Sequence, residues 1–319
     1  MQALIVLALS LLAAAPALAG TLYVSNEQDN TVAVVDADSL SLIATIEVGR
    51  RPRGMGLSID GKSLFVAVGD DNRIDVIDVS SRAVVGTLPS GEDPEFFVVH
   101  PDGKRLFVAN ENDNLVSVVD IAAGKVIGTT DVGVEPEGMA VSADGRLVAC
   151  TSETTSMVHL IDAGTLDLVN NILVDTRPRA AVSSPDGARL WVTSEIRGTA
   201  TVFDTASGEE VGKVQFEVQG IRREGVQAVG IQMTRDGGTV FVALGPANRI
   251  AEVDTSTLAV RRLYLVGQRP WHLALSDDET WAFSANGNSS DISAIDLARE
   301  EVVKSVPVGR GPWGIVFAP

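Results

Sequence analysis

A repeat of 42 residues runs along this chain and constrains its fold more than any other feature of the sequence. Asp-Gly pairs mark the repeat, and they begin at Asp60, Asp102, Asp144, Asp186 and, after 50 residues, Asp236. Asp278 continues the series, with Glu279 in place of glycine. A second marker, an aspartate that ends an apolar run, has the same spacings and occurs at Asp36, Asp78, Asp120, Asp162, Asp204, Asp254 and Asp296. Two markers in one register indicate seven copies of a single structural unit.

The unit that begins at Pro52 shows the internal pattern of the repeat. Four short apolar runs predict four strands, at residues 53–58, 63–68, 73–78 and 84–88. The pair Asp60-Gly61 between the first two runs suits a hairpin turn that needs a positive φ. A helical solenoid is excluded, because no unit has an apolar 3.6-residue period long enough for a helix. Four antiparallel strands in each unit predict the blade of a β-propeller.

The two ends of the chain complete the same pattern. After residue 20 the chain begins at a second strand, residues 21–24, and it finishes on a first strand, residues 313–317. We therefore predict an all-β, seven-bladed β-propeller over residues 20–319, built of four-stranded antiparallel blades. The N- and C-terminal strands are expected to share one blade and so to close the ring without an open edge.

The first 19 residues predict a secretory signal peptide. They carry no charged side chain, they are mostly apolar, and Ala17-Leu18-Ala19 supplies the small residues of a cleavage site. A membrane anchor, the alternative, needs about 20 apolar residues, and Pro16 interrupts this shorter run. We expect a periplasmic or secreted protein with no membrane span after cleavage. The single cysteine, Cys150, means that packing rather than an internal disulfide stabilises it.

Composition narrows the classes of partner. The formal net charge of -17 would repel the phosphates of nucleic acids, so we expect no nucleic-acid binding.

The loops before the predicted innermost strands carry a Gly-x-x-Pro motif, and such loops surround one mouth of a propeller channel. The residue after the proline varies between blades: Arg53, Glu95, Glu137, Arg179, Val229 (after Ala228), Trp271 and Trp313. One interpretation is that these charges pair with one another across the mouth. The other is a ligand pocket, with arginines for an anion and tryptophans as flat walls. His272 and Arg223, in the eight-residue insertion around residues 219–226, are predicted to lie at the same mouth.

Catalytic and metal-binding motifs are scarce. The three histidines are scattered, and neither a Cys-x-x-Cys-His motif nor a Gly-x-Ser-x-Gly motif occurs. The acidic turns at residues 26–30 and 111–114 lack the spacing of a calcium loop and are interpreted as solvated turns. We expect no catalytic residue and no metal site.

The repeats resemble the YVTN family of β-propellers, on the strand motifs Tyr23-Val24-Ser25-Asn26 and Phe107-Val108-Ala109-Asn110. That family spans surface-layer proteins, lactonase-like enzymes and the haem d1 domains of nitrite reductases. The chain is most similar to its subgroup of PQQ-dependent catabolism-associated β-propeller proteins, exported proteins encoded beside quinoprotein alcohol dehydrogenases. The tryptophan-docking repeats of those dehydrogenases are absent from this sequence.

This resemblance implies a non-catalytic periplasmic binding or scaffold protein that serves PQQ-dependent alcohol oxidation. It implies a quinoprotein dehydrogenase or a small anionic ligand as partner, and PQQ as the cofactor to test. Three alternatives stay open: a lactonase-like hydrolase that uses His272 or Glu137, a haem d1 handling protein with His272 as axial ligand, and a purely structural or adhesion propeller.

Overall fold

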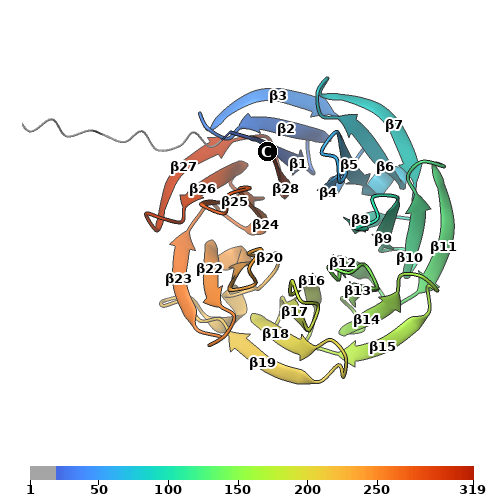
Figure 1. The fold of residues 1–319 in the computed structure, drawn as a ribbon. Helices are drawn as coiled ribbons and strands as arrows, with labels where there is room; N and C mark the ends of the chain where they lie inside the picture. Colours follow the sequence, from blue (N-terminus) through green and yellow to red (C-terminus); the bar gives the residue numbers. More distant parts are fainter. Residues whose placement is uncertain (1–18) are drawn as a thin grey trace, which may run out of the picture.

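A computed structural model describes residues 19–319, so the signal peptide predicted over residues 1–19 lies outside the described residues except for Ala19. Seven four-stranded antiparallel sheets follow one another around a central channel (Figure 1). The predicted seven-bladed all-β propeller is confirmed. Besides strands, the described residues form three short 3-10 turns, η1 (Gly69–Asp71), η2 (Arg223–Gly225) and η3 (Gly245–Ala247). No helix among them is long and apolar enough to cross a membrane.

Each sheet has one strand at the channel and three farther out (Figure 1). The inner strands are β28 (Pro312–Ala318), β4 (Pro52–Leu57), β8 (Pro94–Val99), β12 (Pro136–Val141), β16 (Pro178–Ser183), β20 (Ile231–Met233) and β24 (Pro270–Leu275). The second strands are β1 (Thr21–Asn26), β5 (Ser63–Val68), β9 (Arg105–Asn110), β13 (Leu147–Ser152), β17 (Arg189–Ser194), β21 (Thr239–Ala243) and β25 (Trp281–Asn286). The third strands are β2 (Thr31–Asp36), β6 (Arg73–Asp78), β10 (Leu115–Asp120), β14 (Met157–Asp162), β18 (Thr199–Asp204), β22 (Arg249–Asp254) and β26 (Asp291–Asp296). The outer strands are β3 (Ser41–Glu47), β7 (Ala83–Pro89), β11 (Lys125–Asp131), β15 (Leu168–Leu173), β19 (Glu210–Gln215), β23 (Val260–Leu265) and β27 (Glu301–Pro307).

The ring is closed by the two ends of the propeller, as the sequence predicts. β28 pairs antiparallel with β1, so that Phe317 lies opposite Leu22 and Ile315 lies opposite Val24. The last strand of the chain is thus the inner strand of the sheet that β1, β2 and β3 complete. This pairing removes the free edges that an open sheet would expose.

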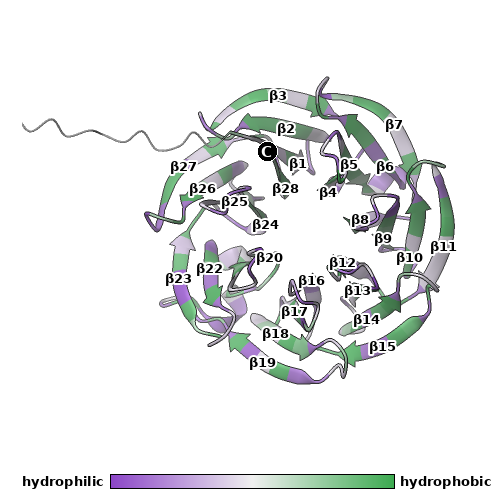
Figure 2. Ribbon diagram, viewed as in Figure 1, coloured by the Kyte–Doolittle hydropathy of each residue, from purple (hydrophilic) through white to green (hydrophobic). Residues whose placement is uncertain are grey.

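The core lies between neighbouring sheets rather than inside any one of them. The second and third strands are mostly buried, and apolar stretches such as those of β2 (Figure 2) are common in them, because both of their faces pack on adjacent blades. In one such layer Val34 of β2 packs with Val66 of β5, and both side chains are fully buried. Each blade therefore stabilises the next, and the stacked layers position the inner strands around the channel.

The repeated aspartates that revealed the fold hold its turns together. At the end of every third strand, the aspartate carboxylate accepts a hydrogen bond from the backbone N–H three residues later, as Asp78 does from Ser81 at 2.7 Å. The other six pairs are Asp36–Ser39, Asp120–Ala123, Asp162–Thr165, Asp204–Ser207, Asp254–Thr257 and Asp296–Arg299. The Asp-Gly turns also form as predicted, with Gly61 at φ +69°. Both sequence markers are therefore explained by turn geometry.

Candidate functional site

The loops that lead into the inner strands bring the residues after the prolines to one end of the channel. In five of these loops the residue before the proline has φ between 56° and 62°, which turns the chain sharply toward the channel. A neighbouring blade fixes this turn: Asn30 Oδ1 accepts from the Arg51 N–H at 3.0 Å, and Asn72 Oδ1 accepts from the Asp93 N–H at 2.9 Å. The proline then starts the inner strand with its fixed φ.

On one side of this mouth, Arg53 joins two blades. Its guanidinium donates to Glu95 Oε2 at 2.9 Å and to Glu27 Oε1 at 2.8 Å, and it lies 5.3 Å from the centre of the Trp313 ring. Glu95 is 0% exposed and Trp313 is 1% exposed. Burial raises the pKa of Glu95, but Arg53 and its other neighbours outweigh that effect and lower it overall, so the carboxylate stays ionised.

On the other side, Arg179 is the centre of a similar group. Its Nη2 lies 2.7 Å from Glu137 Oε1, its Nη1 binds Glu153, and the guanidinium lies 5.5 Å from the centre of the Trp271 ring. Arg179 is 6% exposed and Glu137 is 4% exposed. Burial is the largest influence on Glu137 and raises its pKa to about 7, although Arg179 acts in the opposite direction. This carboxyl group therefore titrates near neutral pH.

A second ring of ion pairs, which the sequence analysis missed, lies around the first. Arg51 binds Glu95 at 2.9 Å, Arg177 lies 2.8 Å from Glu153, and Arg269 lies 2.9 Å from Glu195. A signal for it exists in the sequence, because three glutamates directly follow second strands at 42-residue spacing, and three arginines directly precede prolines. The glutamates are Glu111, Glu153 and Glu195, and the arginines are Arg51, Arg177 and Arg269.

These contacts match the first interpretation, in which the charges pair with one another across the mouth. We call this set of residues the mouth cluster: Glu27, Arg51, Arg53, Asp93, Glu95, Glu111, Glu137, Glu153, Arg177, Arg179, Glu195 and Arg269. Each arginine of the cluster has at least one carboxylate partner, and the carboxylates outnumber the arginines. An anion entering here would have to displace one of them.

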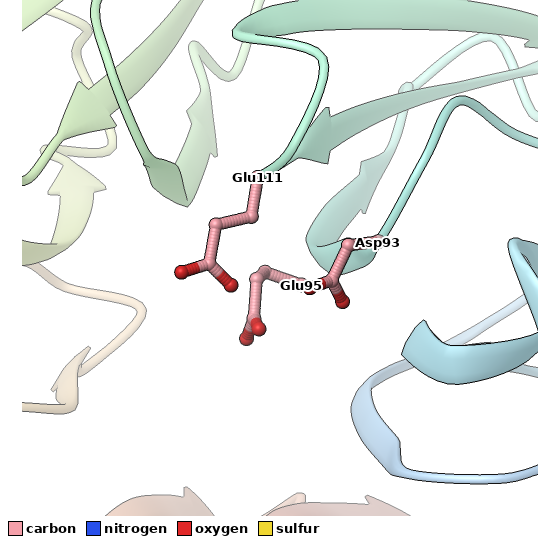
Figure 3. A group of neighbouring side chains, drawn as sticks. All are labelled: Asp93, Glu95 and Glu111. Carbon is pink, nitrogen blue, oxygen red and sulfur yellow. The ribbon is translucent and has the colours of Figure 1, made fainter.

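Three of the carboxylates converge on one point, which Figure 3 shows. Oxygen atoms of Asp93, Glu95 and Glu111 all lie within 4.8 Å of one another, the spacing of a cation site. Arg51 already reaches this point, because it contacts Asp93 and Glu95 and lies 3.8 Å from Glu111. Burial and the neighbouring Glu95 raise the pKa of Glu111 to about 8, so Glu111 carries a proton at neutral pH. The Arg51 guanidinium and the proton on Glu111 therefore offset two of the three negative charges of this group. The turn containing Glu111 is thus part of the mouth rather than only a solvated turn.

His272 lies below the mouth cluster, inside the channel. Its ring stacks on Phe96 with centroids 5.5 Å apart and an interplanar angle of 17°, and it lies 4.1 Å from the Trp313 ring. Nδ1 is 3.3 Å from the backbone oxygen of Trp313. Burial, followed by the charge of Arg179, lowers the pKa of His272 to about 3, so the imidazole is neutral at all physiological pH values. These contacts make His272 part of an aromatic cluster that crosses the channel.

Beside this aromatic cluster the channel contains two cavities. The first has a volume of about 260 Å³ and is lined by residues that include Phe96, Glu137, Arg179, His272 and Trp313. The second has a volume of about 270 Å³ and shares Phe96 and His272 with the first. The channel is therefore subdivided by side chains from opposite blades.

The structure does not bring Arg223 to the mouth cluster. The insertion runs inward from the outer strand β19 to the inner strand β20, and Arg223 lies at its outer part, where it donates to Gln215 Oε1 of β19 at 2.7 Å. Phe216 and Val226 anchor the insertion in the core between two blades. The extra residues thus cover a blade instead of extending over the channel.

The remaining reactive side chains have structural partners. His100 Nε2 hydrogen-bonds the Gly145 carbonyl of the next blade at 2.7 Å, and His159 Nε2 accepts from the Gly133 N–H at 2.9 Å. Cys150 is fully buried, and burial raises the pKa of its thiol far above the usual range. His159 thereby holds a loop that leads into the mouth, and Cys150 lies near enough to Glu137 for that carboxylate to contribute to the shift of its pKa.

Comparisons with known proteins agree with the fold. A family model described as the cytochrome D1 heme domain matches residues 59–186, less than half of the chain. No curated protein is similar enough in sequence to match.

Among solved structures, hydrazine synthase of Kuenenia stuttgartiensis is similar with a TM-score of 0.78 and 20% identity, over 87% of this chain and 92% of that one. A functionally unknown protein of Desulfotomaculum acetoxidans has a TM-score of 0.80 and 17% identity, over 93% and 98% of the two chains. A protein of Lactobacillus plantarum has a TM-score of 0.80 and 18% identity, over 94% and 99%. At these identities the likeness extends to the fold alone: the chain is a β-propeller with a partial match to a haem-domain family.

Proposed function

We propose that this chain is a non-catalytic binding or scaffold propeller that docks a quinoprotein alcohol dehydrogenase in the periplasm. The observation that carries the proposal is the pairing of charges in the mouth cluster, where every arginine is bound to a carboxylate of the same chain, and only Nε donors such as those of Arg53 and Arg179 lack a partner within residues 19–319. His272, the one histidine near the mouth, is neutral and packed between aromatic rings. A hydrolase would need a free base or nucleophile beside an open pocket. Glu137, which lines the first cavity and has a pKa of about 7, is not free because it is bound to Arg179 at 2.7 Å.

The same observation disfavours PQQ as a ligand of the mouth cluster. PQQ carries several carboxylates and would need unpaired arginines, whereas Arg179 is buried, Arg53 is half-buried, and each binds two carboxylates. The small anionic ligand suggested by the sequence meets the same obstacle. The proposed link to PQQ-dependent oxidation therefore runs through the dehydrogenase, not through cofactor carriage.

Exposed charges around the mouth offer a docking face for that partner. Arg50 and Arg310, which lie in loops before inner strands, are largely exposed and each is paired with one aspartate at the rim. Surface charges of this kind steer partners and set specificity.

The test is binding of the mature protein, residues 20–319, to the purified quinoprotein dehydrogenase of the same source by biolayer interferometry. We expect Arg50→Glu combined with Arg310→Glu to weaken binding and to change its salt dependence. Lys62→Glu, a charge reversal in the Asp60-Gly61 turn at the opposite end of the blade, is the matched control and should bind like the wild type. No binding of the wild-type protein would refute the proposal.

Handling of haem d1 is a second candidate, favoured by the family match over residues 59–186. The channel does not fit the macrocycle, because its first cavity of about 260 Å³ is below the roughly 300–1,000 Å³ usual for ligand pockets, and His272 stacks on Phe96. Haem would have to bind outside the channel. Thermal unfolding and a Soret band, measured with haem, PQQ, calcium and PQQ plus calcium, separate these ligands. A ligand at a hundredfold excess over its Kd would add about 2.7 kcal/mol to the stability.

A further inference from the structure

The first cavity of the channel is enclosed at the end formed by the mouth cluster and accessible from the other end. Glu137, Arg179 and Trp313 line the enclosed end and are almost fully buried. Val98, Val141 and Ser183 line the opposite end, close to or at the ends of β8, β12 and β16, and they are only half-buried. A ligand would therefore reach this cavity from the face opposite the proposed docking face.

The walls of the cavity are mainly apolar. Phe96, Met139, Val141 and Ile231 lie around it, and His272 adds the face of a neutral imidazole. An apolar protein cavity of about 150 Å³ is large enough to bind benzene. The volume of about 260 Å³ found here therefore suits a molecule with one substituted ring or a short aliphatic chain.

Two polar groups of the wall, Trp313 Nε1 and Arg179 Nε, lack a hydrogen-bond partner within residues 19–319. Trp313 lines the cavity, it is 1% exposed, and its Nε1 has no hydrogen-bond acceptor within residues 19–319. Buried donors in folded proteins are nearly always satisfied, because losing water without a replacement is unfavourable. An oxygen of a bound molecule would supply the missing acceptor. The amide of Gln232 lines both cavities and offers a second polar contact.

The charges around the cavity disfavour an ionised ligand. Arg179, the one arginine in the wall, is bound to Glu137 and Glu153, and the burial of Glu137 already raises its pKa to about 7. A carboxylate ligand would bring further negative charge close to Glu137, whose own negative charge is already disfavoured by burial.

We infer that the channel binds a small neutral molecule with an apolar body and one carbonyl or hydroxyl oxygen, which accepts a hydrogen bond from Trp313 Nε1. Alcohols and aldehydes belong to this class. The inference stands on the cavity and the unpaired Nε1 of Trp313, and it does not depend on the dehydrogenase partner proposed above.

The test is isothermal titration calorimetry of the mature protein with three probes of one size: benzaldehyde, toluene and benzoate. We expect benzaldehyde to bind about tenfold more tightly than toluene, the factor of one buried hydrogen bond. Benzoate, which has the same body and a negative charge, should bind more weakly than both.

Two tryptophan variants assign the contact. Trp313→Phe keeps an aromatic ring and removes the N–H, so it should remove the preference for benzaldehyde over toluene while toluene still binds. Trp281→Phe removes an indole N–H outside the two cavities, on the second strand β25, and should change neither affinity. The retained toluene binding shows that the Trp313 variant is folded.

The inference is overturned if benzaldehyde does not bind, if benzoate binds as tightly, or if Trp313→Phe keeps the preference. Each of these results leaves the dehydrogenase docking test unaffected, because that test uses a different face and a different readout.

Discussion

Phe96 of β8 and His272 of β24 stack on one another at 5.5 Å although their strands lie on nearly opposite sides of the ring (Figure 1). The contact spans the channel below the mouth cluster, and Trp313 joins it from β28. An inner strand of a propeller thus contacts both its neighbouring blades and a distant one. The ion pairs above this aromatic cluster are buried because the rings beneath them exclude water.

Loss of Arg179 should destabilise the protein strongly. Arg179→Met would leave the buried carboxylate of Glu137 without its cation and Glu153 with Arg177 alone, and removing one partner of a buried pair costs about 3–5 kcal/mol. Arg310→Met, which breaks an ion pair at the rim, should cost no more than about 1 kcal/mol. Urea unfolding of the two variants makes the comparison, and equal costs would contradict the burial of the mouth cluster. The double variant Arg179→Met with Glu137→Gln should recover part of the loss.

Protonation of Glu111 should make the stability depend on pH in the neutral range. Burial and Glu95 raise the pKa of Glu111 from 4.5 to about 8 in the folded protein. The folded state therefore holds a proton that the unfolded state releases, and stability falls as the pH rises from about 4.5 to about 8. Glu111→Gln should flatten this part of the profile, measured by urea unfolding between pH 5 and 8.5. Glu92→Gln, an exposed change in a loop of the same mouth, should keep the wild-type slope.

Asp78, at the end of the third strand β6, should contribute to the response to acid. Hydrogen bonds from the backbone of Ser81 and the hydroxyl of Ser80 lower the pKa of Asp78 from 3.8 to about 2. Its contribution to stability is present above about pH 4 and is lost as the pH falls toward 2. Asp78→Ala should lower the Tm at neutral pH and have little effect near pH 2. Asp38→Ala, an exposed aspartate in a corresponding turn, serves as the control, and a similar effect there would contradict this role.

Removal of the last strand should unfold the protein. A chain that lacks residues 311–319 would leave the first sheet without β28, and would expose β1 along an edge that pairs from Leu22 to Val24 in the intact protein. Trp313 and Ile315, both buried, would be lost from the core as well. We expect no cooperative thermal transition near that of the full chain. A truncated protein that melts like the intact one would show that closure is not required.

The repeat in the sequence predicts most of the fold, but it predicts only part of the arrangement at the mouth. Asp60-Gly61 and Asp78 are local turn signals, so their spacing defines strands and blades without knowledge of the tertiary structure. The same repeat predicts that Arg53 and Glu95 lie at one mouth of the channel, because each directly follows the proline that starts an inner strand.

Other features of the site depend on three-dimensional packing. Glu153 meets Arg179 from a different blade, and the pairing of these two charges follows from how the blades are oriented. The stacking of Phe96 on His272 crosses the ring and has no periodic signal. Arg223 was predicted to lie at the mouth because it belongs to an insertion. Loop length alone does not determine whether a loop extends toward the channel or packs along the outer strand.

The pairing of β28 with β1 also determines when this protein can finish folding. A chain that emerges from a ribosome or a membrane pore presents β1 first and β28 last, so the edge of β1 stays unpaired until the end of the chain arrives. Throughout that interval the incomplete sheet can pair with a strand of another chain. The first sheet therefore cannot be completed until the final nine residues have emerged. A chaperone that covers the edge of β1 would be needed only before that point.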